Sequence, residues 1–388
     1  MAELYTSRLF RLMALNLISG MVGIYMYQLG YRVWEVMLFF AFYFAMRGLV
    51  AIPAGYFVAR VGPKHAMLVS GILYIPGLLA LSQLEGSGVA VLGIFAFLQS
   101  SAVALYTIAY LVNFSKVKHG EHAGKELGFM YIVEKLGSGL SPFLGGAIAY
   151  LFGPTMTMWV ACVIFFLSAA PLFYSPEAVM TRQHISFRGF NWRATYRQFI
   201  AVGSAGADQV SSLGVWALFV AVAVFGTSNN AVYAQIGGLT TIAFASSIIF
   251  SRLYGALIDR RKGALLLKTS VLGNSLLYVL RPFVSTPVGV VMVNITNEAV
   301  TSGFNMPFLK AQFDMADQLP GYRIVYMTLM ELSVSIGALL ASMVLFGLTY
   351  TLGDVRGLQV GFVVIAFLVL PIMSHRFPAL QEPRFFGK

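Results

Sequence analysis

Long apolar runs recur along the whole sequence, and they constrain the fold more than any other feature. Each run extends over about 20 residues, which is the length that an α-helix needs to cross a hydrocarbon core of about 30 Å. The runs are continuous and do not alternate polar and apolar residues at every second position, so they predict helices rather than a β-barrel. Only 11% of the residues are charged, whereas a soluble domain carries about 25%. The sequence therefore predicts an all-α integral membrane protein.

Twelve transmembrane segments can be marked along the chain. They cover residues 9–29, 34–59, 65–84, 88–113, 127–151, 156–174, 198–226, 230–256, 264–284, 287–309, 323–349 and 358–375. The longest polar stretch separates the sixth segment from the seventh. We therefore expect a six-helix bundle over residues 1–174, a cytoplasmic linker loop over residues 175–197 and a second six-helix bundle over residues 198–388.

The basic residues indicate the orientation of the chain in the membrane. If both termini are cytoplasmic, most of the 26 Lys and Arg residues fall at the inner side, whereas Arg32, Arg281 and Arg356 fall at the outer side. Such an excess of positive charge is typical of cytoplasmic loops. We expect a multi-pass protein of the cell (inner) membrane with both termini cytoplasmic. This topology explains the formal charge of +11, and no nucleic-acid partner is expected.

The two halves of the sequence repeat each other. The loop that begins "GYFVARVGPKHAML" at Gly55 has a counterpart, "GALIDRRKGALLL", which begins 200 residues later at Gly255. Glu331 follows Glu134 by 197 residues in the matching segments. Such nearly constant shifts predict two related bundles packed about an axis along the membrane normal.

The repeated loop resembles the motif between helices 2 and 3 of the major facilitator superfamily, Gly-x-Leu-x-Asp-Arg-x-Gly-Arg/Lys-Arg/Lys, and the resemblance covers the whole chain. The first copy keeps Gly55, Arg60, Gly62 and Lys64, and the second keeps Gly255, Leu257, Asp259, Arg260 and Lys262. The first copy has Ala59 where the motif has Asp. The resemblance implies two pseudo-symmetric six-helix bundles, and it implies that these loop residues latch the bundles in one access state.

The fifth segment is similar to the fifth-helix motif of the drug:proton antiporter branch, Gly-x8-Gly-x3-Gly-Pro-x2-Gly-Gly. The matching residues are Gly128, Gly137, Pro142, Gly145 and Gly146, with Ser141 in place of the Gly before proline. Small residues let helices approach closely, and proline kinks a helix. The resemblance implies efflux. The fourth-helix motif of these antiporters is incomplete, because Ala96 replaces its Arg.

Four acids lie inside predicted helices, and we interpret them as candidates for proton coupling: Glu134, Asp208, Glu298 and Glu331. A charged side chain costs several kcal/mol in lipid, so each acid is expected to face a cavity or a partner. Its pKa is raised by desolvation and lowered by a nearby cation, which allows it to load and release a proton. The alternative for each acid is a structural ion pair.

Two bases also lie inside predicted helices. Arg47 falls near the middle of the bilayer and is a candidate for binding a carboxylate or phosphate of the substrate. We expect Lys135 to extend toward the cytoplasmic end of its helix without a partner. Glu134 and Lys135 are not expected to pair, because adjacent helical residues point about 100° apart.

Polar and aromatic residues on helices 1, 4, 7 and 10 are further candidates, because these helices line the pathway in the family that the chain resembles. They are Asn16, Gln99, Tyr106, Gln209, Trp216 and Asn297. The loop "HGEH" at residues 119–122 is interpreted as a solvated face and not as a metal site. The sequence predicts no metal and no cofactor.

These observations predict a secondary transporter that moves a small molecule by alternating access and is coupled to protons. Efflux of amphipathic or drug-like compounds is the first choice, and proton-coupled import of a small solute, whether anionic or not, is the alternative. A lipid-moving or sensor protein on the same scaffold is a third hypothesis. The chain has no catalytic or phosphate-loop motif, so an enzyme is not expected. The expected partners are the substrate, protons and membrane lipids, and the expected state is a monomer.

Overall fold

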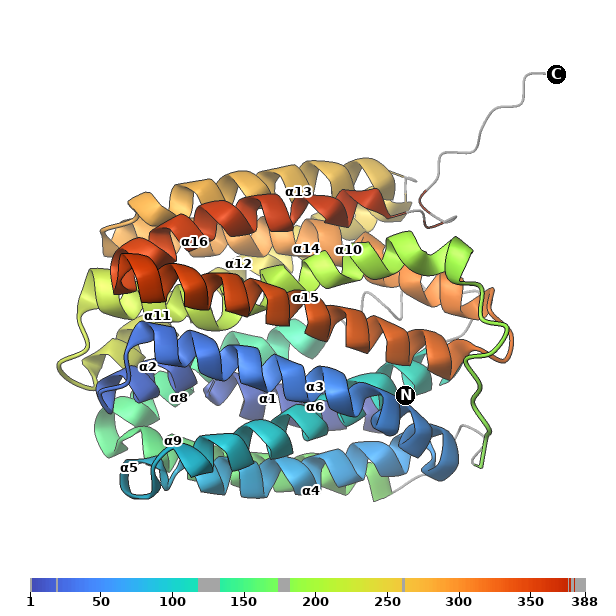
Figure 1. Cartoon of the computed structure of the whole chain (residues 1–388), viewed down its shortest axis with the longest axis horizontal. Helices are drawn as coiled ribbons and strands as arrows, with labels where there is room; N and C mark the ends of the chain where they lie inside the picture. The colour runs from blue at the N-terminus through green and yellow to red at the C-terminus, as the bar shows by residue number, and fades with distance from the viewer. Residues whose placement is uncertain are drawn as a thin grey trace.

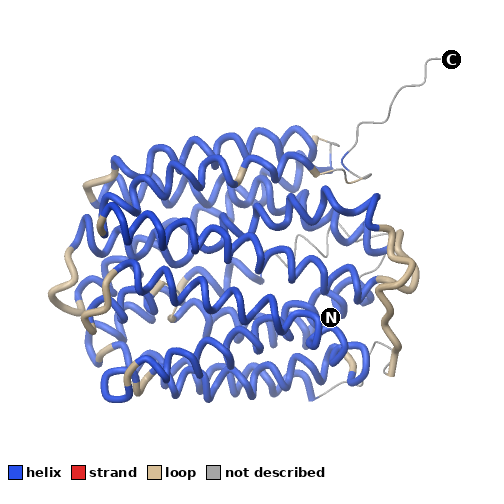
Figure 2. Tube along the Cα trace, viewed as in Figure 1, coloured by secondary structure: helices blue, strands red, loops and turns tan. Residues whose placement is uncertain are grey.

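The computed structural model describes residues 2–18, 20–117, 133–173, 182–259 and 262–375, together with Phe377 and Leu380. Within these residues the chain is helical and contains no strand (Figure 2). The helices run roughly parallel to one long direction. The first half of the chain, up to Phe173, occupies the lower part of the view in Figure 1, and the helices of the second half, from Trp192 onward, occupy the upper part.

The first half contains the elements α1 Ala2–Leu17, α2 Met21–Gln28, α3 Val33–Val61, α4 Pro63–Leu81, α5 Leu84–Ser87, α6 Val89–Val117, a helix at 133–139, α8 Ser141–Phe152, α9 Pro154–Ala169 and the short η2 Ala170–Phe173. Glycine and proline set the sharpest boundaries. Gly62 and Gly153 have φ values of 98° and 88°, which favour glycine, and a proline begins the next helix in each case.

The second half contains α10 Trp192–Val210, η3 Ser211–Val215, α11 Trp216–Val220, η4 Ala221–Phe225, α12 Ala231–Asp259, α13 Gly263–Leu280, η5 Arg281–Phe283, α14 Pro287–Asp317, α15 Arg323–Leu352, α16 Asp354–Leu368 and η6 Leu370–Ser374. Two of these elements, η3 and η4, are π-helical. Such single π-turns often occur at functional sites. The seventh predicted segment is therefore a continuous but irregular helix.

Nine of the described helical stretches are long and apolar enough to cross a membrane. The all-helical membrane architecture is therefore confirmed. The stretches correspond to nine of the twelve predicted segments. The fifth segment begins among residues outside the described part of the chain, and the seventh is irregular as described above. The tenth, α14, carries a polar face that includes Asn294, Asn297 and Glu298.

Helix contacts repeat between the two halves of the chain. In the first half, α4 packs against α6, α3 against α6, and α1 against α8. Their counterparts in the second half are the contacts of α13 with α14, α12 with α14, and α10 with α15. The halves meet chiefly where α3 packs against α15 and where α8 packs against α12. These two seams connect residues that are far apart in the sequence.

Glycines let the backbones of α8 and α12 approach closely. A Cβ atom added at Gly237 would overlap the carbonyl oxygen of Pro142, and one added at Gly146 would overlap that of Tyr233. The adjacent Gly238 has nothing within 4 Å of the same position. The seam between α8 and α12 therefore requires small residues at defined positions.

This difference gives a matched pair of substitutions. Gly237→Ala is expected to lower the thermal midpoint of the purified protein by several degrees, because its methyl group would push α8 and α12 apart. Gly238→Ala is expected to leave the midpoint unchanged or to raise it, because alanine is the better helix former by about 1 kcal/mol. Thermal unfolding of both variants in detergent checks this prediction, and equal midpoints would contradict it.

Candidate functional site

A bidentate ion pair joins α3 of the first half to α15 of the second half. Arg47 donates from Nε to Oε1 of Glu331 at 2.5 Å and from Nη2 to Oε2 at 3.0 Å. The two side chains are only 5% and 2% exposed. Arg47 therefore already holds a carboxylate that belongs to this chain, and its two-point geometry is the strong form of such a pair.

A second ion pair joins the halves at a less buried place. Lys135, in the helix at 133–139, donates from Nζ to Oε2 of Glu298 in α14 at 2.6 Å. The side chains are 16% and 13% exposed, and the ammonium group also lies 5.2 Å from the ring centroid of Phe244. The expectation that Lys135 extends toward the helix end without a partner is wrong. A sequence-distant acid in the other half supplies its partner, which the spacing within one helix does not reveal.

Glu134 faces a different helix from its neighbour Lys135. It accepts hydrogen bonds from Nε and Nη2 of Arg8 in α1, at 3.1 Å and 2.7 Å. The Arg8 guanidinium also stacks on the ring of Tyr110, 4.5 Å from its centroid. This pair lies within the first half of the chain. Its acid was identified from the sequence, but its base lies before the start of the first predicted segment.

Arg11, one turn after Arg8, is buried at 2% exposure. Its Nη1 donates to Oγ of Ser70 at 3.2 Å, and its guanidinium carbon lies 3.7 Å from the ring centroid of Tyr106. Within the described residues it has no ion-pair partner, and its buried Nε has no hydrogen-bond partner. Sequence reasoning assigned no role to this residue, although Arg8 and Arg11 share one face of α1.

Asp208 lies in the interior of the second half. Its Oδ1 accepts hydrogen bonds from Nδ2 of Asn274 at 2.7 Å and from the hydroxyl of Tyr278 at 2.9 Å. The residue is 5% exposed. It immediately precedes the irregular part of the seventh segment, so the polar contact and the π-turn occur at the same place in the helix.

Arg281 is also buried here, at 0% exposure. The sequence places Arg281 at a helix end on the outer side of the membrane but does not reveal this burial. Its Nη2 donates to Oδ1 of Asn297 at 2.7 Å, and its guanidinium lies 4.1 Å from the ring centroid of Tyr278. The helix turn at Arg281–Phe283 directs the side chain back into the bundle, where Tyr278 contacts both Arg281 and Asp208.

The other candidates on helices 1 and 4 make local contacts. Asn16 donates from Nδ2 to the carbonyl oxygen of Leu12 at 2.8 Å and to Oγ of Ser138 at 3.4 Å. Gln99 donates from Nε2 to the hydroxyl of Tyr74. These contacts connect neighbouring helices of the first half.

Trp216, Asn297 and Gln209 are the candidates in the second half. The indole Nε1 of Trp216 donates to Oδ1 of Asn294 at 2.7 Å, and Asn297 binds Arg281 as described above. Gln209 is half-buried. The structure therefore joins Trp216 of the seventh segment to Asn294 of the tenth, whereas Asn297 contacts Arg281 at the end of the ninth.

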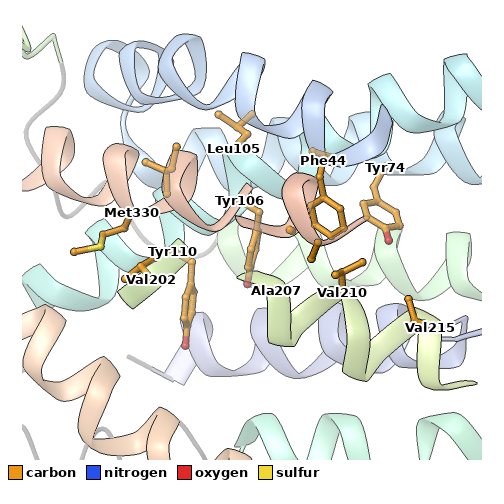
Figure 3. Close-up of a cluster of buried hydrophobic side chains, with 14 of the residues drawn as sticks. Phe44, Tyr74, Leu105, Tyr106, Tyr110, Val202, Ala207, Val210, Val215 and Met330 are labelled. Carbon is orange, nitrogen blue, oxygen red and sulfur yellow. The ribbon is translucent and has the colours of Figure 1, made fainter. Parts of the chain in front are cut away.

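Tyr106 of α6 lies against Arg11 of α1. Figure 3 shows the rings of Tyr106 and Tyr110 extending side by side from α6 with their hydroxyl groups pointing the same way. The two rings stack with centroids 5.7 Å apart. Both hydroxyl groups are buried and have no hydrogen-bond partner within the described residues.

The first copy of the loop motif lies at the seam between α3 and α15. A Cβ atom at Gly55 would overlap the side chain of Thr328, and Gly62 forms the turn with positive φ. The backbone carbonyl of Arg60 accepts a hydrogen bond from the linker residue Arg182 at 2.9 Å. Lys64 is buried rather than solvated, and its Nζ lies 3.8 Å from Glu3. The first copy therefore contacts the other half directly.

The second copy differs from the first. Gly255 has nothing within 4 Å of an added Cβ atom. The side chain of Asp259 and the whole of Arg260 lie outside the described residues, as do Gly128 of the fifth-helix motif and the loop at residues 119–122. Gly137 and Gly145 of that motif pack closely against α1.

Contacts between the halves occur at both ends of the molecule. At the end where α1 begins, Nη1 of Arg323 in α15 donates to the carbonyl oxygen of Ser115 in α6 at 2.8 Å. At the opposite end, the hydroxyl of Tyr233 donates to Oε1 of Gln28 at 2.6 Å, and Nε2 of Gln28 donates to the carbonyl oxygen of Thr227 at 3.2 Å. The buried charges lie between these two sets of contacts.

The sequence matches a known protein family, and the fold is similar to solved structures. Residues 4–295 match the Major Facilitator Superfamily, whereas no curated protein matches the sequence. The solved structures that resemble the chain include the fucose:proton symporter FucP of E. coli, with a TM-score of 0.63 and 15% identity over 96% of this chain and 97% of that chain.

Two other solved structures extend this likeness of fold. The human organic anion transporter MFSD10 (TETRAN) has a TM-score of 0.66 and 14% identity over 98% of both chains. A POT family transporter in complex with a thioalcohol-conjugated peptide has a TM-score of 0.74 and 13% identity over 96% of this chain and 94% of that chain. The family match covers most of the chain, and the fold likeness covers nearly all of it. The chain therefore belongs to the major facilitator superfamily, and its fold is that of a transporter of small solutes.

Proposed function

We propose that this protein is a proton-coupled secondary transporter that moves a small organic solute by alternating access, and that Lys135 and Glu298 form its coupling pair. The observation that carries this proposal is the Lys135–Glu298 ion pair, which links the two halves at 2.6 Å while its side chains stay 16% and 13% exposed. An ion pair that spans the moving seam and remains partly hydrated can be broken by a proton.

The energetics separate this pair from the Arg47–Glu331 pair. Removing one charge from a fully buried pair costs about 3–5 kcal/mol, because the remaining charge is left without compensation. Conformations that exchange during a transport cycle differ by only a few kcal/mol. Separating the partly exposed Lys135–Glu298 pair costs less free energy than separating a buried pair, because water can solvate both groups. Its separation is therefore compatible with exchange between conformations. We therefore assign coupling to Glu298 and a mainly structural role to Glu331.

In the proposed cycle, the neutral carboxyl group of Glu298 no longer attracts Lys135, which weakens the link between the helix at 133–139 and α14. The halves can then move apart at one end while they remain packed at the other. Loss of the proton restores the ion pair and returns the protein to the joined state. The contacts at both ends, Arg323–Ser115 and Tyr233–Gln28, are the ones that must open in turn.

Efflux of amphipathic compounds is the first direction that we propose, because the glycine spacing of the fifth helix resembles that of the drug:proton antiporters. Proton-coupled import of an anionic solute is the second candidate, and the positive charge of Arg11, which has no ion-pair partner among the described residues, favours it. We also propose that both termini face the cytoplasm of a cell whose inner membrane holds the protein as a monomer.

Proton movement in proteoliposomes tests this function. Purified protein is reconstituted with a pH-sensitive dye inside, and a panel of amphipathic cations, organic anions and sugars is added under an imposed pH gradient. At least one solute is expected to produce a proton flux that is absent from empty liposomes. Lipid flipping without a gradient, combined with no solute-dependent proton flux, would contradict the proposal and favour a lipid-moving protein.

A further inference from the structure

We propose that the surroundings of Arg11 form a binding site for the negatively charged group of an organic monoanion. This inference rests on the proposed function and names the class of its substrate. Arg11 comes from α1, Ser70 and Tyr74 from α4, Tyr106 from α6 and Phe165 from α9, so the site lies in the interior of the first half.

The first argument for an anion site is the charge balance of the buried residues. Within the described residues, Arg8 is paired with Glu134, Arg47 with Glu331 and Lys135 with Glu298, and Arg281 lies against Tyr278, whose hydroxyl donates to Asp208. Arg11 has no acid partner among these residues, although it is 2% exposed. One positive charge in this interior is therefore left without a carboxylate, which matches one negative charge on a ligand.

The aromatic contacts of Arg11 do not replace a counter-ion. A guanidinium over an aromatic face is stabilised only modestly, even when both are desolvated. The cost of taking an ion out of water is larger than this gain, even after the protein relaxes. The stacking on Tyr106 at 3.7 Å therefore offsets only part of this cost. An anion beside the guanidinium would supply the rest.

Buried hydrogen-bond donors near Arg11 that have no partner within the described residues indicate that the ligand is an oxyanion. Nε of Arg11 and the hydroxyl groups of Tyr106 and Tyr110 are buried and have no hydrogen-bond partner within the described residues. Figure 3 shows both hydroxyl groups pointing the same way from α6. An arginine Nε–H and a tyrosine O–H can both donate to carboxylate oxygens. Buried donors normally find such partners.

The aromatic residues around Arg11 indicate the chemistry of the uncharged part of the ligand. The rings of Tyr74 and Phe165 both have their centroids 5.5 Å from the guanidinium carbon of Arg11, and the ring of Tyr106 lies closer. Aromatic walls favour an apolar or aromatic body. The geometry therefore fits an aromatic or otherwise apolar carboxylic acid better than a sugar or a cationic drug.

A set of isosteric probes tests this site. Benzoate, benzamide and benzamidine share one shape and carry a negative, zero and positive charge at pH 7.5. Thermal unfolding of the purified protein in a neutral detergent is measured with each probe at equal ionic strength. Benzoate is expected to raise the midpoint, because a ligand that binds the native state stabilises it. The neutral and cationic probes are expected to have no effect.

Substitutions of Arg11 separate binding from a structural role. Arg11→Met keeps the length and removes the charge, so it is expected to abolish the benzoate shift and to leave the ligand-free midpoint unchanged or higher. Arg11→Lys is expected to keep part of the shift. The exposed Arg356→Met serves as the control and is expected to keep all of it. An Arg11→Met protein that is destabilised and still responds to benzoate would overturn the proposal.

An anionic lipid is the other source of a monoanionic oxyanion, and phosphatidylglycerol forms a separate arm of the experiment. A shift with this lipid and none with benzoate would overturn a solute site. The result is independent of proton coupling, because no gradient is present. Proton-driven transport of a neutral or cationic solute that is unaffected by Arg11→Met would refute this site and leave the proposed function standing. Binding of benzoate but not of the other two probes, without any solute-dependent proton flux, would support this site and refute the proposed proton coupling.

Discussion

Glu298→Gln is expected to reduce proton-driven solute accumulation in proteoliposomes by at least about 10-fold while solute exchange across the membrane continues. The amide has the shape of the protonated carboxyl group but cannot release a proton, so the carrier can still move and can no longer couple. A 10-fold change corresponds to about 1.4 kcal/mol. Parallel assays of accumulation and of exchange measure the two activities.

Lys135→Met provides the complementary test. It leaves Glu298 without its cation, so protonation of Glu298 no longer breaks a link between the halves, and accumulation is expected to fall as in Glu298→Gln. The exposed acid Glu85 supplies the control, and Glu85→Gln is expected to transport like the wild type. Full accumulation in Glu298→Gln would remove Glu298 from the coupling mechanism.

Arg47→Met is expected to destabilise the folded protein by about 3–5 kcal/mol, because it leaves the Glu331 carboxylate buried without its partner. The pair is bidentate and its side chains are 5% and 2% exposed. Glu331→Gln is expected to cause a loss of similar size, since it leaves the guanidinium uncompensated. Unfolding of the purified variants by heat or denaturant measures both losses.

The double variant, Arg47→Met with Glu331→Leu, decides whether the loss reflects an unpaired charge. Replacing a whole buried pair by apolar residues is often neutral for stability. Most of the lost stability is therefore expected to return in the double variant. If the losses of the single variants simply add, the two residues act separately, and the assignment of this pair as a structural link between α3 and α15 is wrong.

The helical fold follows from the sequence because its determinants are local. Apolar runs, the turn glycines Gly62 and Gly153 and the prolines that follow them act within a few residues, so most helix ends lie within a few residues of the expected positions. The first segment begins seven residues earlier than expected, the tenth ends eight residues later, and the seventh is irregular. The π-helical turns of the seventh segment at Ser211–Val215 and Ala221–Phe225 depend on packing against other helices, which a hydropathy pattern does not contain.

The candidate site was predicted only in part, because ion pairs depend on contacts between distant segments. The burial cost of a charge singles out Glu134, Asp208, Glu298 and Glu331 from sequence alone, but it does not name their partners. Arg47 and Glu331 are 284 residues apart, and Lys135 and Glu298 are 163 apart.

Arginines near predicted helix ends were harder to place. Arg281 was assigned to the outer side, and no role was predicted for Arg8 or Arg11, whereas the structure packs all three side chains against tyrosine rings. A long side chain can reach either water or the interior from such a position. The choice depends on aromatic residues of other helices, so it is settled only by the tertiary structure.

The central claim is that protonation of Glu298 controls which end of the molecule is open. Measuring the distance between two spin labels at each end tests this claim most directly. In a Cys162→Ala background, one label pair replaces Arg32 and Ser228 at one end, and another replaces Val61 and Gln318 at the end where α1 begins. Lowering the pH from 8.0 to 5.5 is expected to change the two distances in opposite directions. Glu298→Gln at pH 8.0 is expected to give the distances of the wild type at pH 5.5. A Glu298→Gln protein that keeps the full pH response of the wild type would contradict the account.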